Sequence, residues 1–140
     1  MTQKRNADYA ALLLRLATGG LFVAHGLLKV LVFTIPGTVG YFESLGLPAI
    51  FAYLTIFAEI GGGLALIAGF QTRLVSLALI PVLLGAAVLG HGANGWLFSN
   101  PGGGWEFPVF WALAQLSLVL LGDGAYAVKP RGLVRRPAAA

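Results

Sequence analysis

Four long apolar runs divide the chain and predict four membrane-spanning helices. The runs cover residues 9–33, 49–70, 74–90 and 107–122. A helix rises 1.5 Å per residue and needs about 20 mostly apolar residues to cross a bilayer. The last two runs are short by this measure, so we expect them to extend by a turn or to lie in thinned lipid. The pattern predicts an all-α fold: an integral membrane four-helix antiparallel bundle.

The first run carries a polar stripe. Arg15, Thr18, Phe22, His25 and Lys29 recur at steps of three and four residues, so they share one face of a helix. The opposite face is uniformly apolar. Because charged groups are costly inside lipid, we expect the stripe to face other parts of the protein or a water-filled cavity.

The composition agrees with a membrane protein. Hydrophobic residues make up 58% of the chain and charged residues 10%, whereas soluble domains carry about 25% charged residues. The chain has no cysteine, which excludes disulfides and thiol chemistry by this chain alone. The net charge of +4 does not indicate nucleic-acid binding, because the basic residues flank the apolar runs. The first run is also longer than the apolar core of a cleavable signal peptide.

The basic residues predict the orientation of the chain. They lie at the two termini and in the link 71–73, whereas the connections 34–48 and 91–106 contain no Lys or Arg. The positive-inside rule therefore places both termini and the 71–73 link in the cytoplasm. We expect a multi-pass protein of the cell (inner) membrane, with a cytoplasmic N-terminus (1–8), a bundle (9–124) and a disordered cytoplasmic tail (125–140).

A second set of polar residues is expected to meet the stripe near the outer end of the bundle. At helical rise, Glu59 lies about 15 Å below the outer end of its run and His25 roughly 12 Å below the end of its own. A lone buried carboxylate is costly, so we expect Glu59 to be protonated, hydrogen-bonded or paired, with His25 and Lys29 as the nearest partners. The candidate ligand-binding residues are His25, Lys29, Glu59, His91, Glu106, Trp111 and Gln115.

Three interpretations of this set remain open. It can be a structural polar network, a pocket for a polar headgroup such as a quinone, or a metal site. The metal interpretation would use His25, Glu59, His91 and Glu106, but no two of them show the tight spacing of a helical metal motif. In the pocket interpretation, the indole rings of Trp96, Trp105 or Trp111 are expected to form a wall.

Features elsewhere in the runs predict packing and bends. At the cytoplasmic end, Arg15 and Arg73 are expected to form ion pairs with Asp123. Glycines 61–63 favour close helix packing and a bend in the second run, and Pro81 favours a kink in the third.

Short motifs follow one another along nearly the whole chain. They are Arg15-Leu with Gly19-Gly-Leu-Phe22, His25-Gly-Leu-Leu-Lys29, Phe42-Glu-Ser-Leu-Gly-Leu-Pro48, Glu59-Ile-Gly-Gly-Gly63, Gly69-Phe-Gln-Thr-Arg73, His91, Glu106 and Gly122-Asp-Gly124. In this order they resemble the DoxX family of small four-helix membrane proteins, whose relatives include a subunit of a thiosulfate:quinone oxidoreductase. The family's His, Lys and Glu positions fall on His25, Lys29, Glu59, His91 and Glu106.

The resemblance implies a subunit or partner of a quinone-linked membrane redox system with an outward-facing pocket. Glu59 and His25 would be the catalytic pair: Glu59 exchanges a proton, His25 hydrogen-bonds the headgroup, and Lys29 stabilises negative charge. Partners would be the lipid bilayer and other membrane or membrane-associated redox proteins, with an oligomer also compatible. The alternatives are a non-catalytic scaffold that anchors a larger complex, and a small-molecule or ion carrier.

Overall fold

The computed structural model describes residues 3–128. Every regular element in this part of the chain is a helix. The elements are α1 (Gln3–Leu31), α2 (Ile35–Ser44), α3 (Ile50–Ala68), α4 (Thr72–Gly85), the π-helical turn η1 (Ala86–Gly90), the 3₁₀ turn η2 (Gly92–Asn94) and α5 (Glu106–Leu121).

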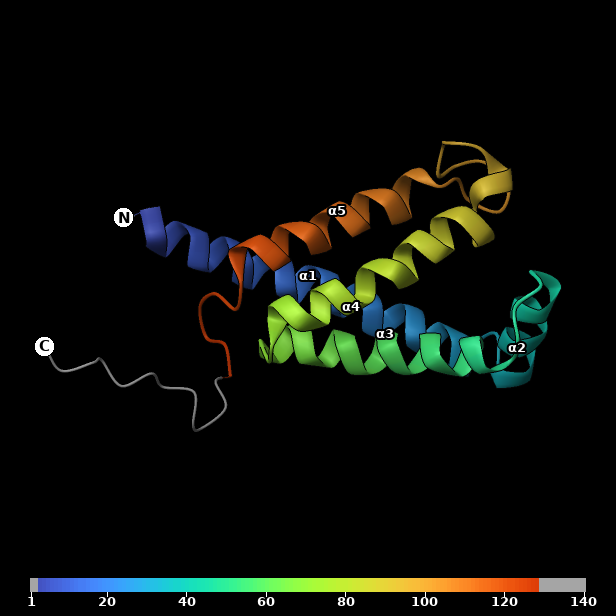
Figure 1. Ribbon diagram of the computed structural model, residues 1–140, viewed down its shortest axis with the longest axis horizontal. Coiled ribbons are helices and arrows are strands. Elements are labelled where there is room, and N and C mark those ends of the chain that lie inside the picture. Colours follow the sequence, from blue (N-terminus) through green and yellow to red (C-terminus); the bar gives the residue numbers. More distant parts are fainter. Residues whose placement is uncertain (1–2, 129–140) are drawn as a thin grey trace, which may run out of the picture.

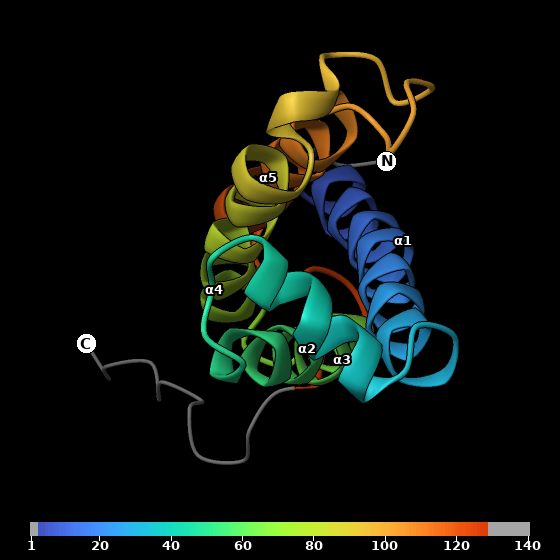
Figure 2. The same ribbon diagram turned by 90° about the vertical axis from the view of Figure 1, so that its right-hand side faces the viewer.

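The long helices run between two ends of the molecule (Figure 1). The start of α1, the α3–α4 link and the end of α5 lie at one end, here called the terminal end. Helix α2 and the segment 91–105 lie at the other, here called the loop end. Helix α1 packs mainly on α3, and α4 mainly on α5. Figure 2, seen from the loop end, shows α2 in front of α3, and α2 also contacts α1.

Three of the four predicted spans are confirmed by length and composition. Helix α1, helix α3 and the continuous stretch Thr72–Gly90 are each long and apolar enough to cross a membrane. Helix α5 is apolar but shorter, with 16 residues, so its span remains a prediction. The main difference in bounds is at the N-terminus, where α1 begins at Gln3, six residues before the predicted start.

The connection 34–48 is more than a link between the first two apolar runs. It contains α2, whose first turn carries Pro36 and whose N-cap Thr34 accepts a hydrogen bond from the Gly37 amide at 3.3 Å. Proline fits the first helical turn because the amide hydrogen it lacks has no helical partner there. Thr34 and Pro36 therefore mark the start of a short helix.

The glycines of α3 permit close packing and do not break the helix. Helix α3 is continuous through residues 61–63. A Cβ atom on Gly63 would lie 2.7 Å from the Gly19 carbonyl oxygen and 2.9 Å from the Val23 amide nitrogen. The two backbones can touch there only because both helices present glycine. Helix α4 likewise continues through Pro81 and changes to the π-helical turn only at Ala86.

Backbone groups replace the predicted ion pairs at the terminal end. The Arg15 Nη2 atom donates to the Ala125 carbonyl at 2.9 Å, and Arg73 Nη2 lies 3.5 Å from the Leu120 carbonyl. The Asp123 carboxylate accepts from the Thr72 amide at 3.0 Å and so caps the start of α4. Lys29–Glu59 is the one ion pair within 4 Å in the described part of the chain, which corrects the prediction for Arg15, Arg73 and Asp123.

The segment after α5 packs against the terminal end. The Ala125 amide donates to the Asp8 carbonyl, and the Val128 amide donates to the Ala68 carbonyl, both at 3.0 Å. Residues 125–128 are therefore held by α1 and α3, in contrast to the predicted disordered tail. The rest of that predicted tail, residues 129–140, lies outside the described residues.

Candidate functional site

The polar stripe of α1 faces the protein interior, as its spacing predicted. Arg15, Thr18 and Phe22 are at most 4% exposed. His25 and Lys29, nearer the loop end, are half-buried. The cost of placing charge in lipid is thus avoided by turning this face toward the other helices.

Lys29 and Glu59 form a two-point ion pair between α1 and α3. The Lys29 Nζ atom lies 2.9 Å from Oε1 and 2.8 Å from Oε2 of Glu59. Glu59 is 7% exposed. Gly26 allows the helices to approach here, because a Cβ at that position would lie 3.3 Å from the Glu59 Cβ. The predicted pairing of Glu59 with Lys29 is therefore present, and both charges are balanced.

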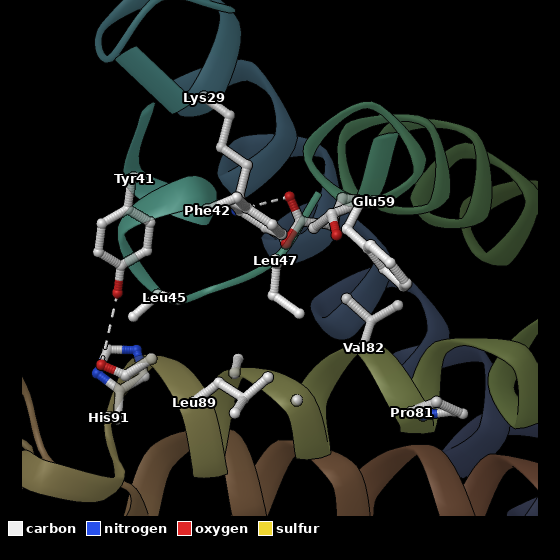
Figure 3. A pocket seen from close by; sticks show the side chains of 15 residues that line it. Lys29, Tyr41, Phe42, Leu45, Leu47, Glu59, Pro81, Val82, Leu89 and His91 are labelled. Atoms are coloured by element: carbon white, nitrogen blue, oxygen red, sulfur yellow. Dashed lines mark hydrogen bonds and ion pairs between the residues drawn. The ribbon is translucent and has the colours of Figure 1, made fainter. Parts of the chain in front are cut away.

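This ion pair borders a cavity of about 420 Å³ at the loop end (Figure 3). A volume of this size suits a small organic ligand, for which pockets span roughly 300–1,000 Å³. Most of the lining is apolar and comes from α2, the link after it, α3, α4 and η1. The lining residues are Lys29, Tyr41, Phe42, Leu45, Leu47, Phe51, Thr55, Glu59, Pro81, Val82, Gly85, Ala86, Leu89, Gly90 and His91.

Polar groups stand on two sides of this cavity. Figure 3 shows Lys29 and Glu59 on one side and His91, below Tyr41, on the other. The Tyr41 hydroxyl lies 3.5 Å from the Gly90 carbonyl oxygen, which links α2 to the π-helical turn. The cavity therefore places charged groups and a titratable ring around an apolar space.

The hydrogen bonds of His91 define its tautomer. Its Nδ1 atom lies 3.1 Å from the Gly102 carbonyl oxygen and 3.0 Å from that of Gly103. Since both neighbours are acceptors, Nδ1 must carry the hydrogen, and in the neutral ring Nε2 is then free to accept a proton or a hydrogen bond.

Two parts of the cavity wall were missed by sequence reasoning. One is α2 with Tyr41 and Phe42, and the other is the π-helical turn that supplies Ala86, Leu89 and Gly90. Turns of this type are frequent at functional sites. Tyr41 and Phe42 are adjacent aromatic residues in the connection 34–48, and they were the available signal for α2. Nothing in the apolar run 74–90 indicated the change to π-helical geometry.

His25, Trp111 and Gln115 are not among the residues that line the cavity. The His25 Nδ1 atom lies 2.8 Å from the Leu21 carbonyl oxygen of its own helix. Its ring centroid is 5.0 Å from that of Trp111, which in turn lies 4.3 Å from the Phe22 ring. No hydrogen bond joins the His25 and Glu59 side chains within residues 3–128. Gln115 is fully buried.

Glu106 belongs to the loop-end segment and not to this cavity. Its Oε1 atom accepts from the Phe98 amide at 2.8 Å, and it borders a separate hollow with Trp96 and Phe98. The Trp96 and Trp105 rings pack edge to face with their centroids 4.5 Å apart. None of the three predicted tryptophans is among the residues that line the cavity. Within the described residues no group of three or more His, Asp or Glu gathers as a metal site would require.

Comparison with known proteins places the chain among its relatives. The DoxX family profile matches residues 10–92. The protein named "Putative oxidoreductase CatD" of Bacillus subtilis (strain 168) is 32% identical over 126 residues, which cover 90% of this chain and 89% of CatD. "Inner membrane protein YqjF" of Escherichia coli (strain K12) is 32% identical over 133 residues, covering 89% of this chain and 93% of YqjF. No solved structure matches. With a helical membrane architecture, the ordered motifs and these matches in agreement, the chain belongs to the DoxX family.

Proposed function

We propose that this protein is a subunit of a quinone-linked membrane redox system and binds a quinone headgroup in the loop-end cavity. The observation that carries this proposal is the cavity itself, an apolar space of about 420 Å³ among membrane helices with an ion pair on one side and an imidazole on the other. Apolar pockets with a few placed polar groups are typical of small-molecule sites.

The lining residues suit a flat apolar ring with oxygen atoms at both ends. The Lys29 ammonium has three donor hydrogens, and its two bonds to Glu59 leave one for a ligand oxygen. Across the cavity, the free Nε2 of His91 can accept a hydrogen from a ligand hydroxyl. When bound, a quinone would take up two electrons and two protons on reduction to the quinol, or release them in the reverse reaction. Glu59 and His91 are the groups at this site that can hold those protons.

The roles predicted from the sequence are redistributed in this proposal. Lys29 keeps its task of stabilising negative charge, and Glu59 keeps its task of exchanging a proton. His91 replaces His25 as the histidine at the ligand, because His91 lines the cavity and His25 does not.

Electrons would be supplied by a membrane or membrane-associated redox partner. The relative's name, "Putative oxidoreductase CatD", supports this assignment. The name of YqjF supports an inner-membrane location. In that membrane we place α5 as a fourth span, which gives an antiparallel four-helix bundle with both termini in the cytoplasm.

One observation favours a scaffold without catalysis. Lys29 and Glu59 satisfy each other at two points, as they would in a purely structural network. Ligand binding separates the two functions, because a scaffold has no need of a cavity that takes a small molecule.

We expect a soluble quinone analogue such as decylubiquinone to bind the detergent-purified protein saturably, as measured by calorimetric titration. Gly85 lines the cavity, and no heavy atom lies within 4 Å of a Cβ built on it. Gly85→Trp should therefore fold and fill the cavity. It is expected to weaken binding by at least about tenfold, or about 1.4 kcal/mol.

Val88→Trp is the matched control for this titration. Val88 is 70% exposed, lies three residues further along the same helical stretch and is not a cavity residue. It should leave the affinity unchanged. Equal affinities of the native protein and the Gly85→Trp variant would contradict the proposed site, and a folded native protein without saturable binding would favour the scaffold.

The proposed orientation predicts which positions react with a membrane-impermeant thiol reagent. Ser99 is exposed at the loop end and Lys4 is exposed at the terminal end, and the chain has no native cysteine. Ser99→Cys should be labelled in intact cells, and Lys4→Cys only after the cells are opened. The opposite pattern would invert the topology.

A further inference from the structure

The interior of the bundle toward the terminal end is polar. Five side chains there are fully buried, at most 4% exposed, although each carries nitrogen or oxygen atoms. They come from α1, α4 and α5 and are Arg15, Thr18, Thr72, Ser76 and Gln115. Polar groups in a membrane interior are costly without hydrogen bonds, so their partners decide what this region does.

Most of these side chains have unpartnered atoms. Thr18 is satisfied by the Leu14 carbonyl of its own helix at 2.8 Å. By contrast, seven buried nitrogen and oxygen atoms have no hydrogen-bond partner within residues 3–128. They are Nε and Nη1 of Arg15, the hydroxyls of Thr72 and Ser76, both amide atoms of Gln115 and Nε1 of Trp111. Gln115 alone can make up to four hydrogen bonds.

The unpartnered groups of α4 and α5 lie at successive depths along the axis of the bundle. The Thr72–Asp123 contact joins α4 and α5 at the terminal end. Measured from there at 1.5 Å per residue, Ser76 lies about 6 Å inward, Gln115 about 12 Å and Trp111 about 18 Å. Successive positions are therefore about one helical turn apart along the axis, and a water molecule can link polar groups that do not reach each other directly.

We propose that Arg15, Thr72, Ser76, Gln115 and Trp111 bind a file of internal water molecules that leads from Asp123 to the Trp111 indole. Water fits this donor set because hydroxyls and an amide both donate and accept, whereas the Arg15 and Trp111 nitrogens only donate. The Arg15 Nη2 atom already donates to the Ala125 carbonyl oxygen, so water has to satisfy only its Nε and Nη1 atoms. About four or five buried waters are ordinary for a chain of this length.

The file would end beside His25, whose ring lies 5.0 Å from that of Trp111. It then gives protons a path from the terminal end toward His25 and Glu59. This use rests on the proposed quinone site, but the water site itself does not.

Hydrogen–deuterium exchange of the Trp111 indole N–H tests the water file. In uniformly ¹⁵N-labelled protein, NMR resolves both the tryptophan indole signals and the backbone amides, and Trp111→Phe assigns the indole in question. We expect this N–H to exchange at least about tenfold faster than the backbone amides of the same turn of α5, because water reaches the indole without unfolding. Gln115→Leu and Ser76→Val should slow it by a similar factor.

Ser117→Ala is the matched control. Ser117 lies on the exposed side of α5 and donates to the Leu113 carbonyl of its own helix at 3.0 Å, so its loss should leave the exchange rate unchanged. If the Trp111 indole of the native protein exchanges only as slowly as those amides, no water reaches it and the proposal is overturned.

Thermal unfolding gives a second measurement, which remains useful if the other variants fold poorly. Gln115→Met keeps the shape of the side chain and removes its polar atoms. With waters bound to Gln115, it should lower the thermal unfolding midpoint by a few degrees, whereas loss of an unhydrated amide would raise the midpoint. All of these measurements are made without quinone, so a failed quinone titration leaves them valid. Slow exchange together with saturable quinone binding would reject the water file alone.

Discussion

Lys29→Met is expected to destabilise the folded protein by about 2–3 kcal/mol. The substitution leaves the Glu59 carboxylate, 7% exposed, without its partner. Removing one member of a buried ion pair costs about 3–5 kcal/mol. We place the effect below that range because the Lys29 side chain retains 19% exposure toward the cavity, so Glu59 can take up a proton. Unfolding in mixed micelles with increasing SDS, followed by circular dichroism, measures the change.

A double substitution distinguishes the loss of the whole ion pair from the loss of one of its members. Lys29→Met combined with Glu59→Met removes both charges, and replacing a whole buried ion pair by apolar residues is often neutral. The double variant should therefore be more stable than Lys29→Met alone. Lys4→Met, at an exposed position, controls for the loss of one positive charge. If the double variant is the less stable of the two, the Lys29–Glu59 pair does not balance buried charge as described.

Gly63→Ala is expected to force α1 and α3 apart and to cost about 1–3 kcal/mol, the usual range for overpacking. The new Cβ would lie 2.7 Å from the Gly19 carbonyl oxygen and 2.8 Å from a methyl carbon of Val23. Backbone atoms cannot move aside as a flexible side chain can. The same SDS unfolding measurement applies, and the separation should also weaken the Lys29–Glu59 pair, which spans the same two helices.

Gly61→Ala is the matched control, two residues away on the same helix. The nearest atoms to a Cβ at Gly61 are ring carbons of Phe57 at 4.0 Å, so the methyl group fits. Since alanine favours a helix over glycine, stability should be unchanged or slightly higher. Equal losses for both variants would show that glycine is not needed for contact between α1 and α3.

The sequence predicted the α1 face and the Glu59 pair because each follows from a cost that the chain must avoid. A helix with Arg15 and Lys29 on one side has to turn that side inward, and a buried Glu59 has to be paired, hydrogen-bonded or protonated, with Lys29 as one of its two nearest partners. The cavity wall follows no such rule. Helix α2 depends on how Thr34 and Pro36 start a turn locally, and the π-helical turn after Gly85 leaves no trace in hydropathy.

The arginines show a different limit of sequence reasoning. Arg15 was expected to pair with a carboxylate, but it bonds to the carbonyl of Ala125. Every residue carries a carbonyl group, so composition cannot single one out. The position of the Ala125 carbonyl depends on the turn after α5, where Gly122 and Gly124 adopt positive φ angles of 84° and 69°. Such a turn places a backbone acceptor by geometry that residue type alone does not specify.

The bond between Arg15 and Ala125 also sets an order of events during synthesis. The two residues are 110 positions apart, which at ordinary translation rates is about 5–20 s. Throughout that time α1 is already made, while the carbonyl that receives its guanidinium does not yet exist. The bond that joins Arg15 to Ala125 at the terminal end can therefore form only after α5 and the turn behind it have been made.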